Sequence, residues 1–300
     1  MATITINRPD QLNALDPETI EQLENCFERA HNDRDVQGIV LAGAGKAFVA
    51  GADVKFFVDK MRAGRVEDIV SFAARGQKLF RRIEQSAKRV VCKLDGMALG
   101  GGAELALACH VIVATPKASM AFPETGIGIY PGLGGTQRLT RRLGKNLARY
   151  FLYTGATADA TTLAALKLAW RVVDTEAIDA TIARAFSDAP KQEGVDSTQC
   201  PLDLAQVAEF IGNAPVQEML AGNMTLPGGE IYSRAVRKVC HKAPGAIERV
   251  AELTTLAVQG DLDAGLKSET DGLQAIFSHP DALEGMSALL EGRRPKFGQT

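Results

Sequence analysis

Short apolar segments alternate with segments of helical periodicity through about the first 175 residues of this 300-residue chain. Strands are predicted at residues 3–6, 38–42, 89–94 and 111–114, and longer helices at residues 17–32 and 66–83. Helices are also predicted near residues 103–109, 135–143, 145–153 and 160–168. Because helices separate the short strands, the pattern favours α/β layering over an all-helical bundle.

The pattern changes beyond residue 185. Prolines and glycines interrupt residues 186–230, and apolar periodicity is weak there, whereas residues 231–300 again have the composition of successive helices. We therefore predict three parts. These are an α/β core at residues 1–185, which also carries the candidate site residues, an irregular insertion or connector at 186–230, and a helical C-terminal region at 231–300.

The composition of the chain argues against a nucleic-acid-binding, membrane or secreted protein. The formal net charge is only -2, which gives no reason to expect nucleic acid as a partner. No apolar run approaches the roughly 18 residues that a membrane helix needs, and the N-terminus has no signal-peptide pattern. The five cysteines are an odd number without metal-ligand spacing, so reduced thiols and a cytoplasmic location are expected.

Two glutamates, Glu104 and Glu124, each lie in a glycine-rich segment, residues 98–106 and 122–137 respectively. Glycine lets backbone N–H groups approach a ligand closely, and such groups can stabilise a developing negative charge. A pair of carboxylates can supply and remove protons beside that charge. The combination indicates an enzyme that performs acid–base chemistry on a carbonyl compound.

Three other kinds of site are not supported. Residues 43–46 lack the glycine spacing and the Ser/Thr of a phosphate-binding loop, and the glycine triplet at 100–102 lacks the dinucleotide-binding pattern. The four histidines have no metal-ligand spacing. Neither a metal nor a nucleotide cofactor is therefore expected.

Several motifs in order resemble the crotonase superfamily, the enoyl-CoA hydratase/isomerase family. The resemblance is carried by residues 7–15 (Asn-Arg-Pro through Leu-Asn-Ala-Leu), by residues 46–54 (Lys-Ala-Phe-Val-Ala-Gly-Ala-Asp-Val) and by the two glutamate segments. It covers residues 3–185 and resumes at about 260–297. It implies a crotonase-like spiral of ββα repeats, a helical C-terminal trimerisation region and assembly as a homotrimer or hexamer.

The resemblance also implies an activity, the reversible addition of water to a 2-trans-enoyl-CoA, as in fatty-acid β-oxidation. Coenzyme A is then part of the acyl-CoA substrate, and no separate cofactor is needed. The position of Glu104 implies the base that activates water, and that of Glu124 the acid that protonates Cα. The remaining positions are implied by the same match: the N–H groups of Ala52 and Gly101 as oxyanion donors, Gly132 as a water contact, and Asp53, Val54 and Lys55 along the acyl-CoA.

Each of these residues also has an ordinary structural explanation. Glu104 could complement the dipole of a helix, and Glu124 could be a solvated loop residue. The glycine triplet could allow close packing of a helix on a strand, and Gly132 could be a turn glycine. Lys55 and the basic tail Arg293, Arg294 and Lys296 could meet CoA phosphates or remain solvated.

Alternatives to hydration stay open on the sequence. The same site could isomerise a double bond or hydrolyse a thioester, and the fold could serve as a non-catalytic CoA-thioester-binding subunit. A strand or hairpin that relatives usually carry before Thr3 has no counterpart here, which would fit either a fused or associated 3-hydroxyacyl-CoA dehydrogenase or simply a short N-terminus. His110 stands where relatives commonly carry aspartate.

Overall fold

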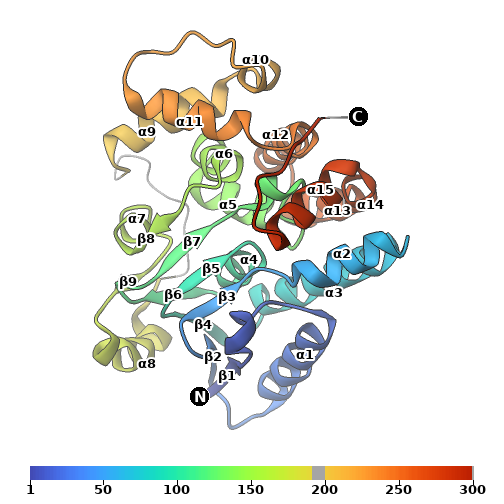
Figure 1. Ribbon diagram of the computed structural model, residues 1–300. Helices are drawn as coiled ribbons and strands as arrows, with labels where there is room; N and C mark the ends of the chain where they lie inside the picture. The colour runs from blue at the N-terminus through green and yellow to red at the C-terminus, as the bar shows by residue number, and fades with distance from the viewer. Residues whose placement is uncertain (191–199, 299–300) are drawn as a thin grey trace. The chain divides into compact units, whose positions relative to one another are not determined.

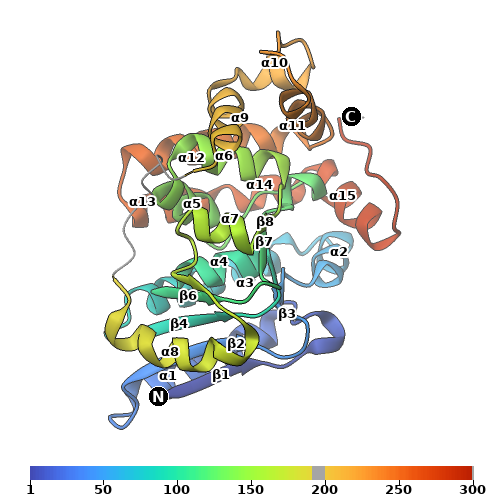
Figure 2. The ribbon, with the colours of Figure 1, turned by 90° about the vertical axis from the view of Figure 1, so that its left-hand side faces the viewer.

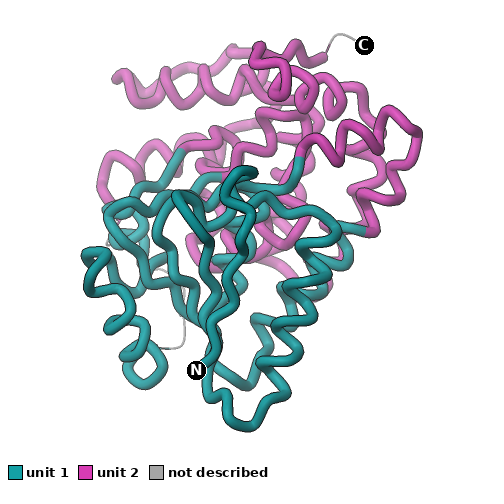
Figure 3. The backbone as a smooth tube through the Cα atoms, turned by 60° about the horizontal axis from the view of Figure 1, so that its bottom comes forward, with its two compact units in different colours: residues 1–53, 72–121, 157–193 teal, residues 54–71, 122–156, 194–300 magenta. Residues whose placement is uncertain are grey.

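The computed structural model describes residues 1–190 and 200–298. The chain forms two compact units, each made of segments that are far apart in the sequence (Figure 3). Unit 1 contains residues 1–53, 72–121 and 157–193, and unit 2 contains residues 54–71, 122–156 and 194–300.

Unit 1 contains two β-sheets, whose strands are drawn as arrows in Figure 1. The larger sheet has the order β1-β2-β4-β6-β9 and is parallel throughout. The smaller sheet has the order β3-β5-β7-β8, in which only the β7–β8 pair is antiparallel. The strands are β1 (Ala2–Ile6), β2 (Gly38–Gly43), β3 (Ala47–Ala50), β4 (Arg89–Leu94), β5 (Met97–Leu99), β6 (Val111–Ala114), β7 (Ser119–Ala121), β8 (Ala158–Asp159) and β9 (Arg171–Val172).

The two sheets grow by the same repeated step. β2, β4 and β6 each add a strand to the larger sheet, and the strand that follows each of them along the chain adds to the smaller sheet. Helical segments then lead to the next pair of strands. This strand–strand–helix order is the crotonase-like ββα spiral that the sequence predicted.

The helices of unit 1 include α1 (Pro17–Asn32), whose bounds agree with the predicted 17–32. The Asp16 side chain accepts a hydrogen bond from the N–H of Thr19 at 2.7 Å, and Pro17 occupies the first helical position. An N-cap followed by proline fixes where the helix starts. The others are α4 (Gly101–Ala108), α7 (Ala160–Ala165), α8 (Ile178–Asp188), the short 3₁₀ segments η1 (Pro9–Gln11) and η3 (Thr175–Ala177), and most of α3 (Val66–Glu84).

An apolar cluster joins α8 to one face of the larger sheet, where the helix packs against β4 and β6 (Figure 2). The strand residues of the cluster are Val40, Val91, Val111 and Val113, and α8 contributes Ile178, Ile182 and Ala185. Since side chains alternate along a strand, Ile39 and Leu41 of β2 face the other side of the sheet, and both are buried. The central strands are thus covered on both faces, as parallel strands usually are.

His110, the residue before β6, makes two hydrogen bonds to Val90 of β4. Its Nδ1 accepts a hydrogen bond from the N–H of Val90 at 2.8 Å, while its backbone N–H donates to the carbonyl of Val90 at 2.9 Å. An aspartate at this position would offer a carboxylate oxygen to the same N–H. The departure from the usual residue therefore conserves a hydrogen-bond acceptor.

Unit 2 is helical. Its elements are α2 (Val54–Arg62), the start of α3, η2 (Glu124–Ile127), α5 (Gly135–Leu143), α6 (Lys145–Thr154), α9 (Leu202–Asn213), α10 (Val216–Leu220), α11 (Glu230–Cys240), α12 (Pro244–Gln259), α13 (Leu262–Asp271), α14 (Leu273–Ser278) and α15 (Pro280–Leu290). α5, α6 and α12 pack against one another, and α9 and α11 pack on α6.

Arg149 of α6 ties three of these helices together. Its guanidinium donates to the carbonyl of Gly212 at the end of α9 at 2.7 Å. It also donates to Thr254 Oγ1 at 2.9 Å, and to the Ala251 carbonyl and Thr255 Oγ1 of α12 at 2.8 Å each. The planar fork of arginine suits such a set of acceptors in different directions.

α9 and α10 lie within residues 186–230, for which the sequence predicted an irregular insertion or connector. Residues 191–199 of that segment lie outside the described residues. Over residues 1–190 and 200–298, no helix is both long enough and apolar enough to cross a membrane.

Candidate active site

The positions of Ala52 and Gly101 follow from the pairing of two neighbouring strands. β3 and β5 run parallel, and Ala50 is in register with Leu99 at their carboxyl ends. Ala52 and Gly101 each lie two residues beyond these paired positions. Since neighbouring strands are about 4.8 Å apart, the register brings the two predicted N–H donors to the same edge of the smaller sheet.

The direction of the Ala52 N–H is set by a parallel bridge to Leu15. The N–H of Leu15 donates to the carbonyl of Gly51 at 2.9 Å, and the N–H of Asp53 donates to the carbonyl of Leu15 at 2.8 Å. Because successive backbone groups of an extended chain point to opposite sides, Ala52 turns its own N–H away from Leu15. Gly51 has φ +92°, a conformation that favours glycine.

The Asn-Ala-Leu motif at residues 13–15 supports this loop. The buried Asn13 side chain donates to the carbonyls of Ala44 and Ala47 at 2.8 Å each, and its Oδ1 accepts from the N–H of Arg8 at 2.8 Å. Asn13 itself has φ 60°, which asparagine tolerates better than most residues. The motif that carried the family resemblance thus shapes the turn that leads to Ala52.

Gly101 is the first residue of α4, and Glu104 lies one helical turn later. The first N–H groups of a helix have no acceptor within the helix and carry positive dipole character. Gly102 allows α4 to lie directly on β3, because a Cβ on it would be 2.0 Å from the carbonyl oxygen of Val49. The close-packing explanation of the triplet is therefore confirmed for Gly102, and it is compatible with a donor role for Gly101.

Unit 1 thus brings Ala52, Gly101 and Glu104 together at the carboxyl end of β3 and β5. Glu104 is buried, in the first turn of α4, where the helix dipole favours its negative charge. Two N–H groups and a carboxylate in this order can bind an oxyanion and move a proton nearby.

Glu124 belongs to unit 2 and begins the 3₁₀ turn η2. It is buried, and the turn is held by its neighbours: Thr125 Oγ1 donates to the carbonyl of Leu152 in α6 at 3.1 Å, and the Thr125 carbonyl accepts from the N–H of Ala243 at 3.0 Å. A Cβ on Gly128 would lie 2.1 Å from the carbonyl oxygen of Asp281 in α15. A turn packed this closely fixes the backbone of Glu124, which is not the environment of a solvated loop residue.

Gly132 also belongs to unit 2. A Cβ there would lie 2.9 Å from Cδ2 of Leu273, so glycine allows close contact with α14. The buried Glu269 of α13 holds the same loop, since its carboxylate accepts hydrogen bonds from the N–H of Gly134 and from Thr136 Oγ1. A carboxylate at the start of α5 also complements the dipole of that helix.

The predicted acyl-CoA contacts and the basic tail have varied surroundings. Asp53 donates its N–H to Leu15, Val54 starts α2, and the exposed Lys55 pairs with Asp59 at 2.5 Å. In the tail, Arg293 binds the Glu284 carboxylate through two nitrogens at 2.6 and 2.7 Å. Arg293 therefore has a structural role, anchoring the tail to α15.

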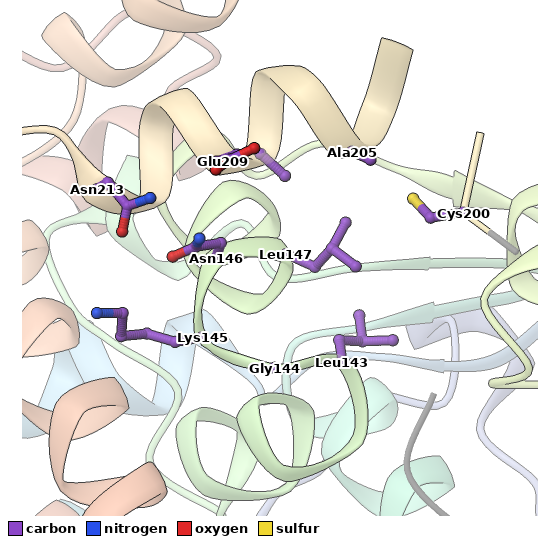
Figure 4. A pocket seen from close by; sticks show the side chains of 10 residues that line it. Leu143, Gly144, Lys145, Asn146, Leu147, Cys200, Ala205, Glu209 and Asn213 are labelled. Atoms are coloured by element: carbon purple, nitrogen blue, oxygen red, sulfur yellow. The ribbon is translucent and has the colours of Figure 1, made fainter. Parts of the chain in front are cut away.

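A cavity of about 520 Å³ lies in unit 2, between α9 and the turn that joins α5 to α6 (Figure 4). It is lined by Leu143, Gly144, Lys145, Asn146, Leu147, Cys200, Ala205, Ala208, Glu209 and Asn213. None of the predicted site residues lines it. Among the residues that the structure describes, no cluster of three or more His, Cys, Asp or Glu side chains could hold a metal ion.

The sequence did not indicate Glu269, which supports the loop after Gly132. Glu269 lies in an ordinary helical segment and has no local sequence signal, because it acts on a loop more than a hundred residues earlier in the chain.

The chain is similar to known proteins over almost its whole length. The family model described as enoyl-CoA hydratase/isomerase matches residues 1–299. A short-chain-enoyl-CoA hydratase of Clostridium acetobutylicum is 30% identical over 295 residues, covering 98% of this chain and 92% of its own length. A crotonyl-CoA hydratase of Syntrophomonas wolfei is 30% identical over 298 residues, covering 99% and 94%.

Solved structures agree on the fold. The crystal structure of an enoyl-CoA hydratase from Rhodobacter sphaeroides has a TM-score of 0.84 at 22% identity, covering 98% of this chain and 88% of its own. A carnitinyl-CoA dehydratase from Mycobacterium thermoresistibile has a TM-score of 0.82 at 23% identity, covering the same shares of the two chains.

Proposed function

Because this chain belongs to the enoyl-CoA hydratase/isomerase family over essentially its whole length, we propose that it is an enoyl-CoA hydratase. It adds water reversibly to a 2-trans-enoyl-CoA and gives the 3-hydroxyacyl-CoA. The named hydratases of which this chain covers more than nine-tenths support the activity. The coenzyme A moiety belongs to the substrate, and the residues described here need no further cofactor for the reaction.

The proposed reaction starts with the thioester oxygen bound by the N–H groups of Ala52 and Gly101. Glu104 removes a proton from water, and the oxygen of that water bonds to Cβ. The electrons of the double bond move toward the thioester, where the two N–H groups stabilise the enolate oxygen. Glu124 delivers a proton to Cα as the carbonyl reforms. Exchange with solvent then removes the proton that Glu104 took from water and returns one to Glu124, so that one water has been added in total and both glutamates regain their starting forms.

The observation that carries this proposal is the arrangement at the carboxyl end of β3 and β5. The in-register pair Ala50 and Leu99 leads to Ala52 and Gly101, and Glu104 follows one turn later on the same helix. Proton transfer by a positioned carboxylate contributes about 10²–10⁴ in rate, and removing an oxyanion donor costs about 10²–10³. Unit 1 therefore supplies both a carboxylate, on Glu104, and the two N–H donors, on Ala52 and Gly101.

The test is hydration of crotonyl-CoA, followed by loss of absorbance of the conjugated thioester. The purified protein should hydrate it, and Glu104→Gln and Glu124→Gln should each lower kcat by about 10²-fold or more because an amide cannot transfer the proton. Both variants should keep the wild-type fold, since an amide and a carboxylate have nearly the same shape. An inactive wild-type protein, or variants as active as wild type, would refute the proposal.

Product analysis separates hydration from the other chemistries of the family. A double-bond isomerase would convert a 3-enoyl-CoA to the 2-enoyl-CoA without forming a hydroxyl group, and a thioester hydrolase would release free CoA. A non-catalytic binding subunit would bind the thioester and change nothing. For a hydratase, 3-hydroxyacyl-CoA is the expected product.

The proposal has further parts. Asp53, Val54 and Lys55 lie along the acyl-CoA, and the N–H of Gly132 helps to hold the water. The protein assembles as a homotrimer or hexamer in the cytoplasm. Light scattering would give the oligomeric state, and cell fractionation the location.

A further inference from the structure

Lys242 lies in the connection between α11 and α12, and its ammonium group occupies space that only glycine leaves open. A Cβ on Gly126 would lie 2.9 Å from Lys242 Nζ, and a Cβ on Gly155 would lie 3.3 Å from it. The same Cβ on Gly155 would be 3.5 Å from the carbonyl oxygen of Phe122 and from Cα of Pro123. The ammonium is therefore packed among residues on both sides of Glu124 in the chain.

The backbone around Lys242 is joined to the turn that carries Glu124. The N–H of Ala243, the next residue, donates to the carbonyl of Thr125 at 3.0 Å. The N–H of Lys242 itself donates to the carbonyl of Val239 in α11 at 2.9 Å. These bonds fix the lysine to both α11 and η2, so the position of its side chain does not depend on a flexible surface loop.

The charges near Lys242 act on it in opposite directions. Burial lowers its pKa first, repulsion by Lys238 of α11 lowers the pKa further, and attraction by Glu124 of η2 raises it. The attraction is mutual, so the ammonium favours the ionised form of the Glu124 carboxylate by the same interaction. Lys238 is exposed, so solvent screens its charge strongly. Lys242 is half-buried, so solvent screens its attraction to Glu124 less.

We infer that Lys242 is a positioning residue for the proposed hydration, one that holds the Glu124 carboxylate in place and favours its ionised form. The inference rests on the proposed function, because it assigns to Lys242 an effect on a proton-transferring group. Lys242 need not touch the substrate. Its effect is on the proton affinity of Glu124, and therefore on the pH at which that residue exchanges its proton.

The decisive variant is Lys242→Met, compared with wild type in the pH dependence of kcat/KM for crotonyl-CoA. The limb of the profile due to Glu124 is identified as the one that Glu124→Gln abolishes. Loss of the neighbouring positive charge should move that limb by about one pH unit to higher pH, the lower end of the usual effect of an opposite charge at 4–6 Å. Lys242→Arg should move it less, because the charge remains.

Gly126→Ala tests the same effect without removing any charge. Gly126 has no positive φ, so alanine is compatible with its backbone, but the added methyl would collide with Lys242 Nζ. Displacing the ammonium should move the same limb in the same direction. Lys238→Met is the matched control: it removes one exposed lysine from α11, and the limb should stay where it is.

A titration of Glu124 by NMR of ¹³C-labelled glutamate, assigned with Glu124→Gln, gives a readout that does not depend on turnover. If Lys242→Met leaves this midpoint and the kcat/KM limb at their wild-type values, the inference about Lys242 is wrong while hydratase activity stands. If wild type does not hydrate crotonyl-CoA but the midpoint still rises in Lys242→Met, the proposed function fails and the electrostatic pairing stands. Should Lys242→Met not fold, Gly126→Ala and Lys242→Arg decide the question.

Discussion

Gly102 of α4 lies so close to Val49 of β3 that a single added carbon would be 2.0 Å from the Val49 carbonyl oxygen. This contact sets how near the start of α4 comes to the strand that leads to Ala52. The two backbone N–H groups proposed to bind the thioester oxygen belong to these two elements. The packing of one glycine on one carbonyl therefore controls the spacing of the proposed oxyanion donors.

Gly102→Ala should affect both stability and rate. The methyl group must push α4 away from β3, and overpacking of this kind typically costs about 1–3 kcal/mol of the free energy of unfolding. It also separates Gly101 from Ala52, so kcat/KM for crotonyl-CoA should fall by about 10²-fold, comparable to loss of an oxyanion donor. Chemical unfolding and the hydration assay measure the two effects.

Gly245→Ala is the control for this substitution. Gly245 lies in the first turn of α12, and a Cβ there would meet no atom within 4 Å. Alanine should leave activity unchanged and should raise the free energy of unfolding by about 0.4–1 kcal/mol through its helical preference. If Gly102→Ala behaved like Gly245→Ala, the close contact would have no role in the spacing of the donors.

The second prediction concerns stability alone and is made for Arg149 of α6. Arg149→Met removes the guanidinium that donates to the Gly212 carbonyl, the Ala251 carbonyl and the hydroxyls of Thr254 and Thr255, so the free energy of unfolding should fall by about 2–4 kcal/mol. Arg149→Lys should recover little of it, because an ammonium cannot reach acceptors in several directions at once. Arg184→Met, at an exposed arginine of α8, should change it by no more than about 0.5 kcal/mol.

Elements with both a periodic pattern and a start signal were predictable from the sequence. α1 has its N-cap and proline at residues 16 and 17, and α3 has a long apolar stripe, so both predicted ranges agree with the structure to within one residue. β4 and β6 were equally clear as apolar runs. In each case the information is local, in side chains that lie within a few residues of one another.

The smaller sheet was not predictable in the same way. β5 and β7 have three residues each, too short for a period to be seen, and they adjoin glycine-rich turns. Their strand conformation comes from pairing with each other and with β3, which is information from the tertiary structure. α9 was missed for a related reason: proline and glycine residues on either side of it suggested an irregular chain.

The site residues can also be separated into those that the local sequence indicates and those that depend on the tertiary structure. Gly101 and Glu104 could be recognised because they are close in sequence and lie in a segment of unusual composition. Ala52 needed the family resemblance, since its environment depends on the bridge to Leu15. Lys242 could not be found, because its relation to Glu124 exists only after α11 and α12 have packed beside η2. The roles assigned to Glu104 and Glu124 stay predictions until the variants are assayed.

His110 gives a test of a hydrogen-bond acceptor. His110→Ala leaves the N–H of Val90 without its side-chain partner and should lower the free energy of unfolding by about 1 kcal/mol. His110→Asp should restore most of this loss because it again offers an acceptor. Equal destabilisation by both substitutions, measured by denaturant unfolding, would show that the hydrogen bond is not what matters at this position.

The C-terminal tail should detach from α15 in acid. Hydrogen bonds from Arg293 and from the N–H of Lys296 lower the pKa of Glu284 from 4.5 to about 2. A lowered pKa in the folded state means that the carboxylate stabilises the docked tail above its ordinary pKa of 4.5. That contribution is lost as the pH falls from about 4.5 through about 2.

Hydrogen exchange at the Lys296 amide reports on this docking directly. Protection should be full at neutral pH and should decrease through that acid range, and Glu284→Gln should lower it already at neutral pH. Glu291→Gln is the matched control, since Glu291 also pairs with Arg293 but accepts no bond from Lys296. Its Lys296 amide should stay protected. Equal loss of protection in the two variants would mean that the charge of Arg293, not the Glu284 acceptor, holds the tail against α15.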